Sequence, residues 1–255
     1  DVALVTDGDF TVKNAQAYAL AGEYGMTGFI PSEEISCSWS HFNVIPLNES
    51  AYEHFKDVNQ ENTIMDQFSQ LPEFIKETHD TGAAITANHP WQSYGLFYAA
   101  VYGSIPGGYV DDYDTIEINS CCPDDENLAV IVSATELWTS YINGNSIYDD
   151  INGNPVVTEK AHYIVGGSDT HDVLYPGFAA DDYTNARADA NYASGKIRTY
   201  AYVGETEENN ITANGLAYAE AIVDGHSYTT YGPLLDMDKM PGEVYNADGT
   251  FNVNF

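Results

Sequence analysis

The stretch Val2-Ala3-Leu4-Val5-Thr6-Asp7-Gly8-Asp9 shows the pattern that decides the fold: a short apolar run that ends in a polar, glycine-containing loop. The same pattern returns at residues 83–90 (AAITANHP) and 163–171 (YIVGGSDTH). Short apolar runs of this kind are typical of strands buried in a parallel sheet. Stretches with helical spacing occur at residues 12–23, 65–78 and 213–223. This alternation predicts an α/β fold whose parallel strands are arranged as a barrel.

Further strands are expected at residues 27–36, 42–47, 114–119 and 197–203. Pro72 is expected to kink or restart the helix at 65–78, because proline cannot donate a helical hydrogen bond. The 255 residues fit one large domain, or one domain with a small appendage.

The composition excludes several classes of protein. Hydrophobic residues make up 44% of the chain and aromatic residues 13%, which excludes a disordered acidic tail. With 8 Lys and Arg against 39 Asp and Glu, the formal net charge is −31, which excludes nucleic-acid binding. The longest apolar stretch, near residues 128–134, is far shorter than the roughly 20 residues of a membrane span.

The charge and the chain ends favour a secreted or cell-surface protein. A charge of −31 repels itself and is tolerated best where salt or bound cations such as calcium screen it. The chain opens at Asp1, inside one expected strand, and closes inside another, so we expect a processed or partial piece of a longer protein. The cysteines Cys37, Cys121 and Cys122 leave two interpretations open: a disulfide from Cys37 to one of the adjacent pair, or a buried thiol.

Acidic and histidine side chains gather where the expected strands end, which is where α/β barrels carry their reactive groups. Asp7 and Asp9 flank a glycine, and they could bind a hard cation, orient a histidine or form an ordinary Asp-Gly turn. In Ser32-Glu33-Glu34-Ile35-Ser36, alternation along a strand directs one glutamate toward an interior site and the other away from it. A solvent-exposed glutamate pair is the alternative. His41 begins the next expected strand and can approach the same place.

Two further groups contain histidine. In Asn88-His89-Pro90 the proline biases His89 toward an extended backbone, and His89 is either a ligand or a hydrogen-bonded core residue. Asp169 and His171 lie two residues apart after an apolar run, so both side chains can reach one metal ion.

The remaining histidines and the aromatic residues are less informative. His54 and His79 are expected to face solvent, and the place of His162 stays open. Trp39 and the other tryptophans are expected to pack in the core or at its rim rather than to line a sugar pocket.

Several of these segments resemble the PHP (polymerase and histidinol phosphatase) superfamily, and its CehA/McbA-type metallohydrolases in particular. Gly167-Ser168-Asp169-Thr170-His171 matches the G-S-D-x-H motif of that family closely. The segments Pro31-Ser32-Glu33-Glu34-Ile35-Ser36 and Ser40-His41-Phe42-Asn43 look like its G-x-E and G-H-F-N strands, and Asn88-His89-Pro90 looks like its H-P. Thr6-Asp7-Gly8 resembles its TDH segment, and residues 195–202 and 215–234 resemble its late strand and helix.

The resemblance implies a distorted (β/α)7 barrel over residues 1–235, with residues 236–255 beginning a small C-terminal β-rich extension. It also implies divalent metal ions, which would be Zn, Mn or Fe, with Ca as a further candidate at the acidic surface. The metal ligands it implies, with the two nearby aspartates added, are Asp7, Asp9, Glu34, His41, His89, Asp169 and His171. Glu34, Asp169 and His171 are also the expected catalytic residues. Arg187, Arg198 and Asn43 are the candidates for binding the substrate.

The chain departs from the family pattern at the first strand. The family opens with an H-x-H pair upstream of TDH, and this chain starts after that point. Gly8 stands where the family has the histidine of TDH, and glycine cannot ligate through a side chain. Asp7 or Asp9 could substitute and give a site richer in oxygen ligands.

Two functions from different classes follow. The first is a metal-dependent hydrolase, a phosphoesterase or other esterase, that attacks a small-molecule ester or phosphoester with a metal-activated water. The alternative is a catalytically degenerate PHP-like barrel that serves as a secreted binding, structural or assembly subunit and self-associates. Gly8, the missing H-x-H pair and the charge favour this alternative. A carbohydrate-binding module that uses the aromatic residues is a third interpretation.

Overall fold

A computed structural model describes most elements of the chain. The described residues are 2–6, 14–55, 70–90, 95–118, 148–156, 160, 162–167 and 198–230.

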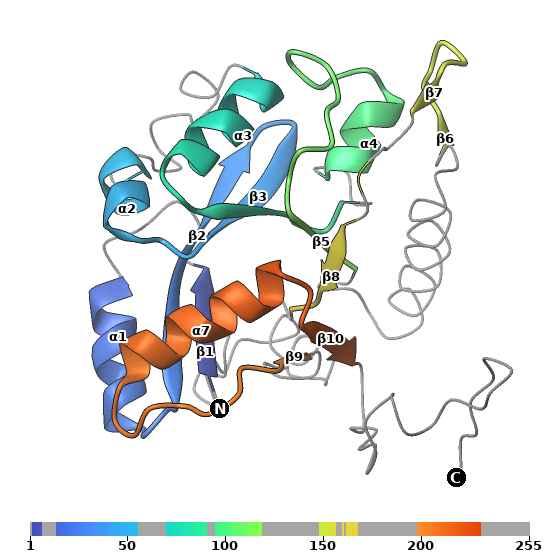
Figure 1. The fold of residues 1–255 in the computed structure, drawn as a ribbon. Helices are drawn as coiled ribbons and strands as arrows, with labels where there is room; N and C mark the ends of the chain where they lie inside the picture. Colours follow the sequence, from blue (N-terminus) through green and yellow to red (C-terminus); the bar gives the residue numbers. More distant parts are fainter. Residues whose placement is uncertain are drawn as a thin grey trace, which may run out of the picture.

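The centre of the fold is a six-stranded sheet with the order β1-β2-β3-β4-β5-β8 (Figure 1). Its strands are β1 (Val2–Thr6), β2 (Gly28–Cys37), β3 (Ser40–Ile45), β4 (Ala84–Ala87), β5 (Thr115–Glu117) and β8 (Tyr163–Val165). The pairs β1–β2, β4–β5 and β5–β8 are parallel, whereas β3 is antiparallel to both β2 and β4. Two small antiparallel ribbons are added by β6 (Tyr148–Asp149) with β7 (Pro155–Val156), and by β9 (Arg198–Ala201) with β10 (Ser227–Thr230).

The predicted α/β class is confirmed, but the expectation of parallel strands is wrong at β3. Only Ser38 and Trp39 separate β2 from β3, and so short a connection can join only antiparallel neighbours. Within the described residues the strand order is linear, from β1 to β8. The seven-stranded barrel stays a prediction, and the expected extension at 236–255 lies outside the described residues.

Helices lie on both faces of this sheet (Figure 1). They are α1 (Asn14–Glu23), α2 (Glu49–Phe55), α3 (Leu71–Asp80), α4 (Leu96–Val101) and α7 (Ile211–Val223). Helix α3 begins at Leu71, and Pro72 lies in its first turn, where the missing N–H costs nothing. The earlier part of the expected helix, at residues 65–69, lies outside the described residues.

Two hydrophobic clusters hold the layers together. The larger cluster packs the sheet, through residues such as Ile35 and Phe42, against α2, α3 and α4. The smaller cluster lies on the opposite face, where Ile30 and Ile45 meet Ala219 and Ile222 of α7. Helix α7 therefore covers part of the face opposite to the main core.

Alternation along the strands gives the sheet one apolar face and a second face that carries many polar side chains beside the smaller apolar cluster. In the register, Glu34 pairs with Asn43, Asn43 with Thr86, and Thr86 with Thr115. We call this side the polar face, and its polar residues are Ser32, Glu34, Ser36, His41, Asn43, Thr86, Thr115 and Glu117. A row of polar side chains between buried strands is where a binding or catalytic site can form.

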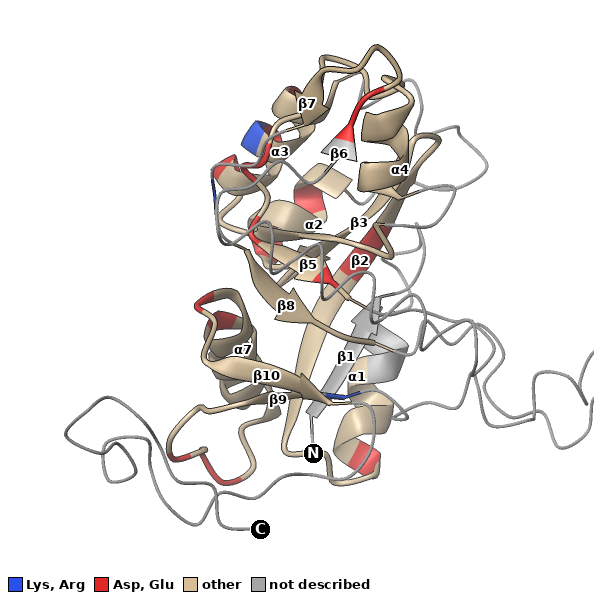
Figure 2. Ribbon diagram, turned by 90° about the vertical axis from the view of Figure 1, so that its right-hand side faces the viewer, with Lys and Arg blue, Asp and Glu red and all other residues tan. Residues whose placement is uncertain are grey.

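Acidic residues recur over the elements of the described fold, whereas cations are few (Figure 2). The cations among the described residues are Lys76 on α3, Lys160, and Arg198 on β9. Lys76 pairs with Asp80 one turn away, and Lys160 Nζ lies 3.7 Å from an oxygen of Asp114. Within the described ranges, the helices are all too short or too polar to cross a membrane.

Candidate metal centre

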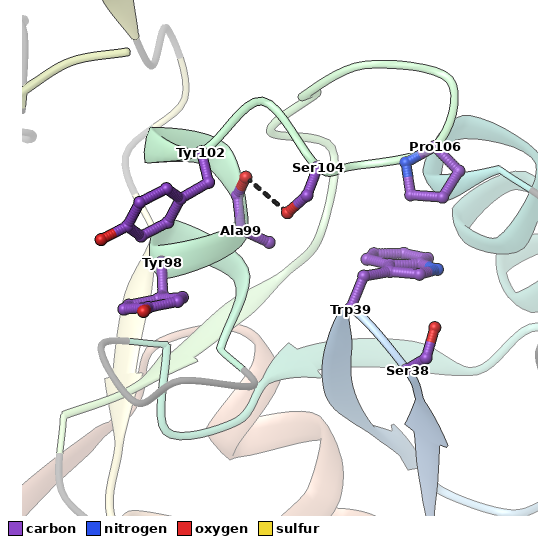
Figure 3. Close-up of a pocket in the computed structure, with 7 residues that line it drawn as sticks. All are labelled: Ser38, Trp39, Tyr98, Ala99, Tyr102, Ser104 and Pro106. Atoms are coloured by element: carbon purple, nitrogen blue, oxygen red, sulfur yellow. Dashed lines mark hydrogen bonds between the residues drawn. The ribbon is translucent and has the colours of Figure 1, made fainter. Parts of the chain in front are cut away.

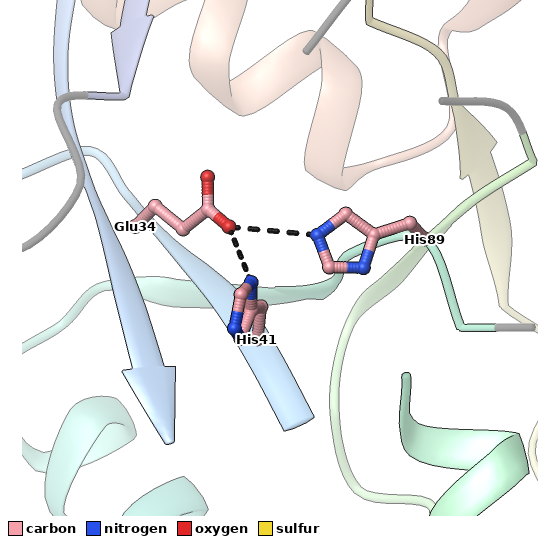
Figure 4. A group of neighbouring side chains, drawn as sticks. All are labelled: Glu34, His41 and His89. Atoms are coloured by element: carbon pink, nitrogen blue, oxygen red, sulfur yellow. Dashed lines mark hydrogen bonds and ion pairs between the residues drawn. The ribbon is translucent and has the colours of Figure 1, made fainter. Parts of the chain in front are cut away.

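Three strands bring Glu34, His41 and His89 together on the polar face (Figure 4). Glu34 lies in β2, His41 is the second residue of β3, and His89 follows β4 by two residues. The register pairs His41 with Ser36, so Glu34 is its diagonal neighbour across the hairpin. Diagonal neighbours on one face are within reach of long side chains. The antiparallel hairpin therefore places the imidazole beside the carboxylate.

The ligand atoms of the three residues lie close enough together to converge on one ion. His41 Nδ1 lies 3.0 Å from Glu34 Oε1, and His89 Nε2 lies 3.6 Å from the same oxygen. The two imidazole rings meet edge to face, with centroids 4.9 Å apart. One ligand atom from each residue lies within 4.8 Å of the other two. Atoms bound to one zinc ion at about 2.1 Å lie roughly 3 to 3.5 Å from their neighbours, so the two distances to Glu34 are close to what one ion needs.

The electrostatics of the cluster keep Glu34 ionised. Burial raises the pKa of this carboxyl group, but hydrogen bonds and charge from His41 and His89 outweigh burial and lower the pKa to about 2. Glu34 is therefore a carboxylate at neutral pH. One carboxylate with two imidazoles is a donor set suited to Zn, Mn or Fe, whereas calcium prefers oxygen ligands.

The backbone at His89 differs from the prediction. Its φ angle is +24°, in the left-handed region, so the extended conformation expected before Pro90 is wrong. Two hydrogen bonds hold the main chain at Asn88 and His89. Asn88 N–H donates to the His41 carbonyl at 3.1 Å, and His89 N–H donates to Glu117 Oε2 at 2.7 Å. Tertiary contacts therefore override the local preference.

Glu117 is a residue of this region to which the sequence analysis gave no role. It ends β5, is 8% exposed and lies on the polar face. A Cβ atom built on Gly167 would lie 3.4 Å from Glu117 Oε1, so the segment after β8 passes beside this carboxylate. The sequence did contain a signal for Glu117, because it is a carboxylate at the end of an apolar strand, the same feature that made Asp7 a candidate.

Two buried amide oxygens lie near the cluster. The Oδ1 atoms of Asn43 and Asn88 are buried and have no hydrogen-bond partner among the described residues. Asn43 pairs with Glu34 in the register, and Asn88 precedes His89. Buried polar atoms without a partner are rare in proteins, so these oxygens are suited to water, an ion or a ligand.

Several predicted site residues lie outside the described part of the chain. These are Asp7, Asp9, Asp169, His171 and Arg187, as well as Cys121 and Cys122. Arg198 is described and is exposed on β9, in the ribbon with β10. The neighbouring Thr199 hydroxyl bonds the backbone of Gly166 at 3.0 Å, so β9 lies against the start of the glycine-rich segment.

Other expectations are settled by burial. Glu33 is fully buried on the face opposite to Glu34, so the alternative of a solvent-exposed glutamate pair is wrong. Cys37 is buried in the larger core cluster. His162 is also a core residue, 1% exposed. His54 and His79 are exposed, as expected, and each also lies beside a carboxylate, Glu77 for His54 and Asp114 for His79.

A pocket of about 410 Å³ lies beside α4, away from the cluster (Figure 3). Its lining residues are Ser38, Trp39, Tyr98, Ala99, Tyr102, Ser104 and Pro106, and Glu34, His41 and His89 are not among them. Trp39 is only 9% exposed and packs edge to face against Phe42. This tryptophan therefore belongs mainly to the core, as expected, and only borders the pocket.

Comparisons with known proteins give little further information. Neither a family model nor a curated protein matches this chain. One similar solved structure is a two-domain protein from Bacteroides vulgatus ATCC 8482, described as containing a predicted PHP-like metal-dependent phosphoesterase. The identity is 14% and the TM-score 0.46, and the match covers 91% of this chain. The chain spans 56% of the length of that neighbour, and a likeness this distant does not establish a common fold.

Proposed function

We propose that this protein is a metal-dependent hydrolase that acts on small phosphoesters or related esters. The observation that carries the proposal is the meeting of Glu34, His41 and His89, from three strands, with ligand atoms within 4.8 Å of one another. The motif resemblance of Gly167-Ser168-Asp169-Thr170-His171 supports it, since the segment that leads into this motif runs beside Glu117.

Each residue of the cluster has a role that follows from its chemistry. Glu34, ionised at neutral pH, supplies the anionic ligand, while His41 Nδ1 and His89 Nε2 supply nitrogen ligands. A divalent ion held by such residues acidifies a bound water and neutralises charge on the substrate oxygens. In this proposal Asp169, His171 and either Asp7 or Asp9 complete the ligand set, and Glu34, Asp169 and His171 serve catalysis.

Substrate binding is assigned to the few groups that suit an anion. Asn43 presents an amide beside Glu34 on the polar face, and its buried oxygen has no hydrogen-bond partner among the described residues. Arg198 and Arg187 are proposed to attract the ester or phosphoester group, because a net charge of −31 would otherwise repel it. The same charge supports the proposal that the protein works outside the cell or at its surface.

The test is metal content together with activity. Purified protein, loaded with zinc, manganese or iron(II) and freed of excess metal, should retain at least one ion per chain. It should hydrolyse p-nitrophenyl phosphate or a related aryl ester. We expect His41→Ala to weaken metal binding by at least about tenfold and to lower hydrolysis in proportion, because one of three converging ligands is lost.

His54→Ala is the matched control. His54 is a partly exposed histidine on α2 whose Nε2 lies 3.4 Å from Glu77 Oε2, and it is not part of the cluster. This variant should bind metal and hydrolyse ester like the wild type. If wild-type protein retains only calcium, or no ion at all, the hydrolase is ruled out and the degenerate binding or assembly subunit becomes the better description.

A further inference from the structure

His89 reaches Glu34 from a main-chain conformation that needs support. A φ angle of +24° is uncommon for a residue with a side chain, and it persists only where the surroundings enforce it. The residue is 6% exposed, and its imidazole lies 3.6 Å from the Glu34 carboxylate. The position of this ring therefore depends on whatever holds the peptide before and after it.

Helix α4 holds the chain on the C-terminal side. The Pro90 carbonyl accepts hydrogen bonds from the N–H groups of Phe97 and Tyr98, at 2.9 and 3.2 Å. Gly95 presses against the same turn, since a Cβ atom there would come within 2.4 Å of the His89 carbonyl oxygen. These contacts fix the peptides after His89 but leave its own N–H group to another partner.

Glu117 is that partner. Its Oε2 atom accepts the His89 N–H at 2.7 Å in a buried setting, a short distance typical of hydrogen bonds that involve a charged group. The carboxylate comes from the end of β5, a strand that contributes no member of the Glu34, His41 and His89 cluster. Its second oxygen faces Gly167, at the start of the segment with Asp169 and His171.

We infer that Glu117 is a positioning residue: its carboxylate fixes the left-handed His89 peptide, and through it the orientation of the His89 imidazole toward Glu34. Glu117 acts through the main chain of His89. The inference rests on the proposed function in one respect, namely that His89 binds a metal ion. The hydrogen bond itself can be tested in metal-free protein.

Two substitutions separate this role from others. Glu117→Gln keeps the size and an acceptor oxygen, whereas Glu117→Met keeps the size and removes the acceptor. Thr115→Val is the control, because Thr115 is buried on the same strand and face and its hydroxyl lies 2.6 Å from that of Thr86. Two readouts apply: exchange of the His89 amide by NMR in metal-free protein, and zinc affinity by competition with a chromophoric chelator.

We expect slow exchange of the His89 amide in the wild type and in Glu117→Gln. In Glu117→Met, exchange should be at least about tenfold faster and zinc affinity at least about tenfold weaker. Glu117→Gln should bind zinc within about twofold of the wild type, because its amide oxygen can still accept the hydrogen bond from the His89 N–H. Thr115→Val should lower the melting temperature without changing either readout.

Four results would overturn the inference. Fast exchange of the His89 amide in the wild type would do so without any variant, which covers the case in which Glu117→Met does not fold. Slow exchange in Glu117→Met would show that the acceptor is not needed, and fast exchange in Glu117→Gln would show that an acceptor at this position is not sufficient. Zinc binding lost equally in both would make Glu117 a direct ligand. If the wild type binds no zinc, the proposed function fails, while the exchange data still decide the role of Glu117.

Discussion

His162 is a buried imidazole whose surroundings keep it neutral. The ring is 1% exposed and stacks on Tyr113, with centroids 4.0 Å apart. Its Nε2–H donates to the Asp111 carbonyl at 2.8 Å. Burial lowers the pKa of His162 to about 4, the hydrogen bond to Asp111 opposes this shift, and the nearby charge of Lys160 adds to it. His162 is therefore protonated only near pH 4 in the folded protein, whereas in the unfolded chain it is protonated near pH 6.5.

This difference in pKa predicts a loss of stability in mild acid. Above pH 6.5 the residue is neutral in both states, so its contribution is constant. As the pH falls from 6.5 to 4, the unfolded state gains a proton first, and the free energy of unfolding drops by about 3 kcal/mol in total. Urea unfolding at pH 7 and pH 5 should show wild-type protein losing about 2 kcal/mol more than His162→Gln between these two values.

His226 provides the control for this prediction. It is an exposed histidine after α7, so His226→Gln removes a histidine without disturbing the core, and it is compared with His162→Gln at the same two pH values. If His162→Gln also loses stability as steeply as the wild type, then His162 is not the group that titrates.

The identity of the site residues could be predicted from the sequence, whereas the backbone conformation at His89 could not. Glu34, His41 and His89 were identifiable because acids and histidines stand out where apolar runs end. The left-handed φ at His89 was not predictable, because it depends on Glu117 and Gly95, which are distant or featureless in the sequence. Local preference before Pro90 pointed the other way.

At the scale of elements, α7 approaches β2 more closely than side chains would allow. A Cβ atom on Gly215 would lie 1.9 Å from the Phe29 carbonyl oxygen, so the helix backbone rests directly on the strand. Asn214 anchors the same contact. Its side-chain amide donates to the Thr27 carbonyl at 2.7 Å and to the Glu207 carbonyl at 2.9 Å. Helix α7 is thus held by a small residue and an amide, in addition to its apolar side chains.

We expect Gly215→Ala to push α7 away from β2. Overpacking of this kind costs typically about 1–3 kcal/mol, and more where the clash is with backbone, as it is here. Chemical unfolding at pH 7 measures the change in the free energy of unfolding.

Gly22→Ala is the matched substitution for this experiment. Gly22 also lies in a helix, but the nearest atom to an added Cβ would be Ile211 Cδ1, at 3.8 Å. Alanine favours helix over glycine by about 0.5–1 kcal/mol, so Gly22→Ala should be neutral or stabilising. A stable Gly215→Ala protein would contradict the close packing of α7 on β2.

The strands of the main sheet were largely predictable, whereas their pairing and the helices α2 and α4 were not. The expected strands at 27–36 and 42–47 correspond to β2 and β3, because apolar runs and turns are local signals. The direction of β3 was missed because the Ser38–Trp39 turn carries no glycine or asparagine to mark a hairpin. The contact of Gly215 with Phe29 joins positions far apart in the chain, and no local pattern reveals it.

At the scale of the whole molecule, repulsion among carboxylates opposes folding. The formal net charge is −31, and Asp and Glu are spread over the described elements rather than confined to one (Figure 2). Salt shortens the range of this repulsion to roughly 10 Å at 0.1 M ionic strength. The compact state gains more from screening than the unfolded chain, because folding brings the charges closer together.

The melting temperature should therefore rise with NaCl. Between 20 and 500 mM we expect a gain of about 1–2 kcal/mol, or roughly 3–6 °C for a chain of this size. Differential scanning fluorimetry in NaCl and KCl measures it, and both salts should act alike because screening depends on ionic strength. A melting temperature that does not change with salt would show that the charges are already balanced by bound cations or spaced too far apart to matter.

The hairpin of β2 and β3 also limits which insertions and deletions the protein can tolerate. Neighbouring residues of a strand point to opposite faces of the sheet. One residue inserted at Ser38 or Trp39 that shifted the β2–β3 register by one position would therefore turn Phe42 toward Glu34 and His41 into the core. An insertion of two residues would restore the alternation, although it would lengthen the reach to the carboxylate. Insertions and deletions at this tip should therefore be tolerated far less than those in the connection between α4 and β5, and natural length variation should collect in the latter.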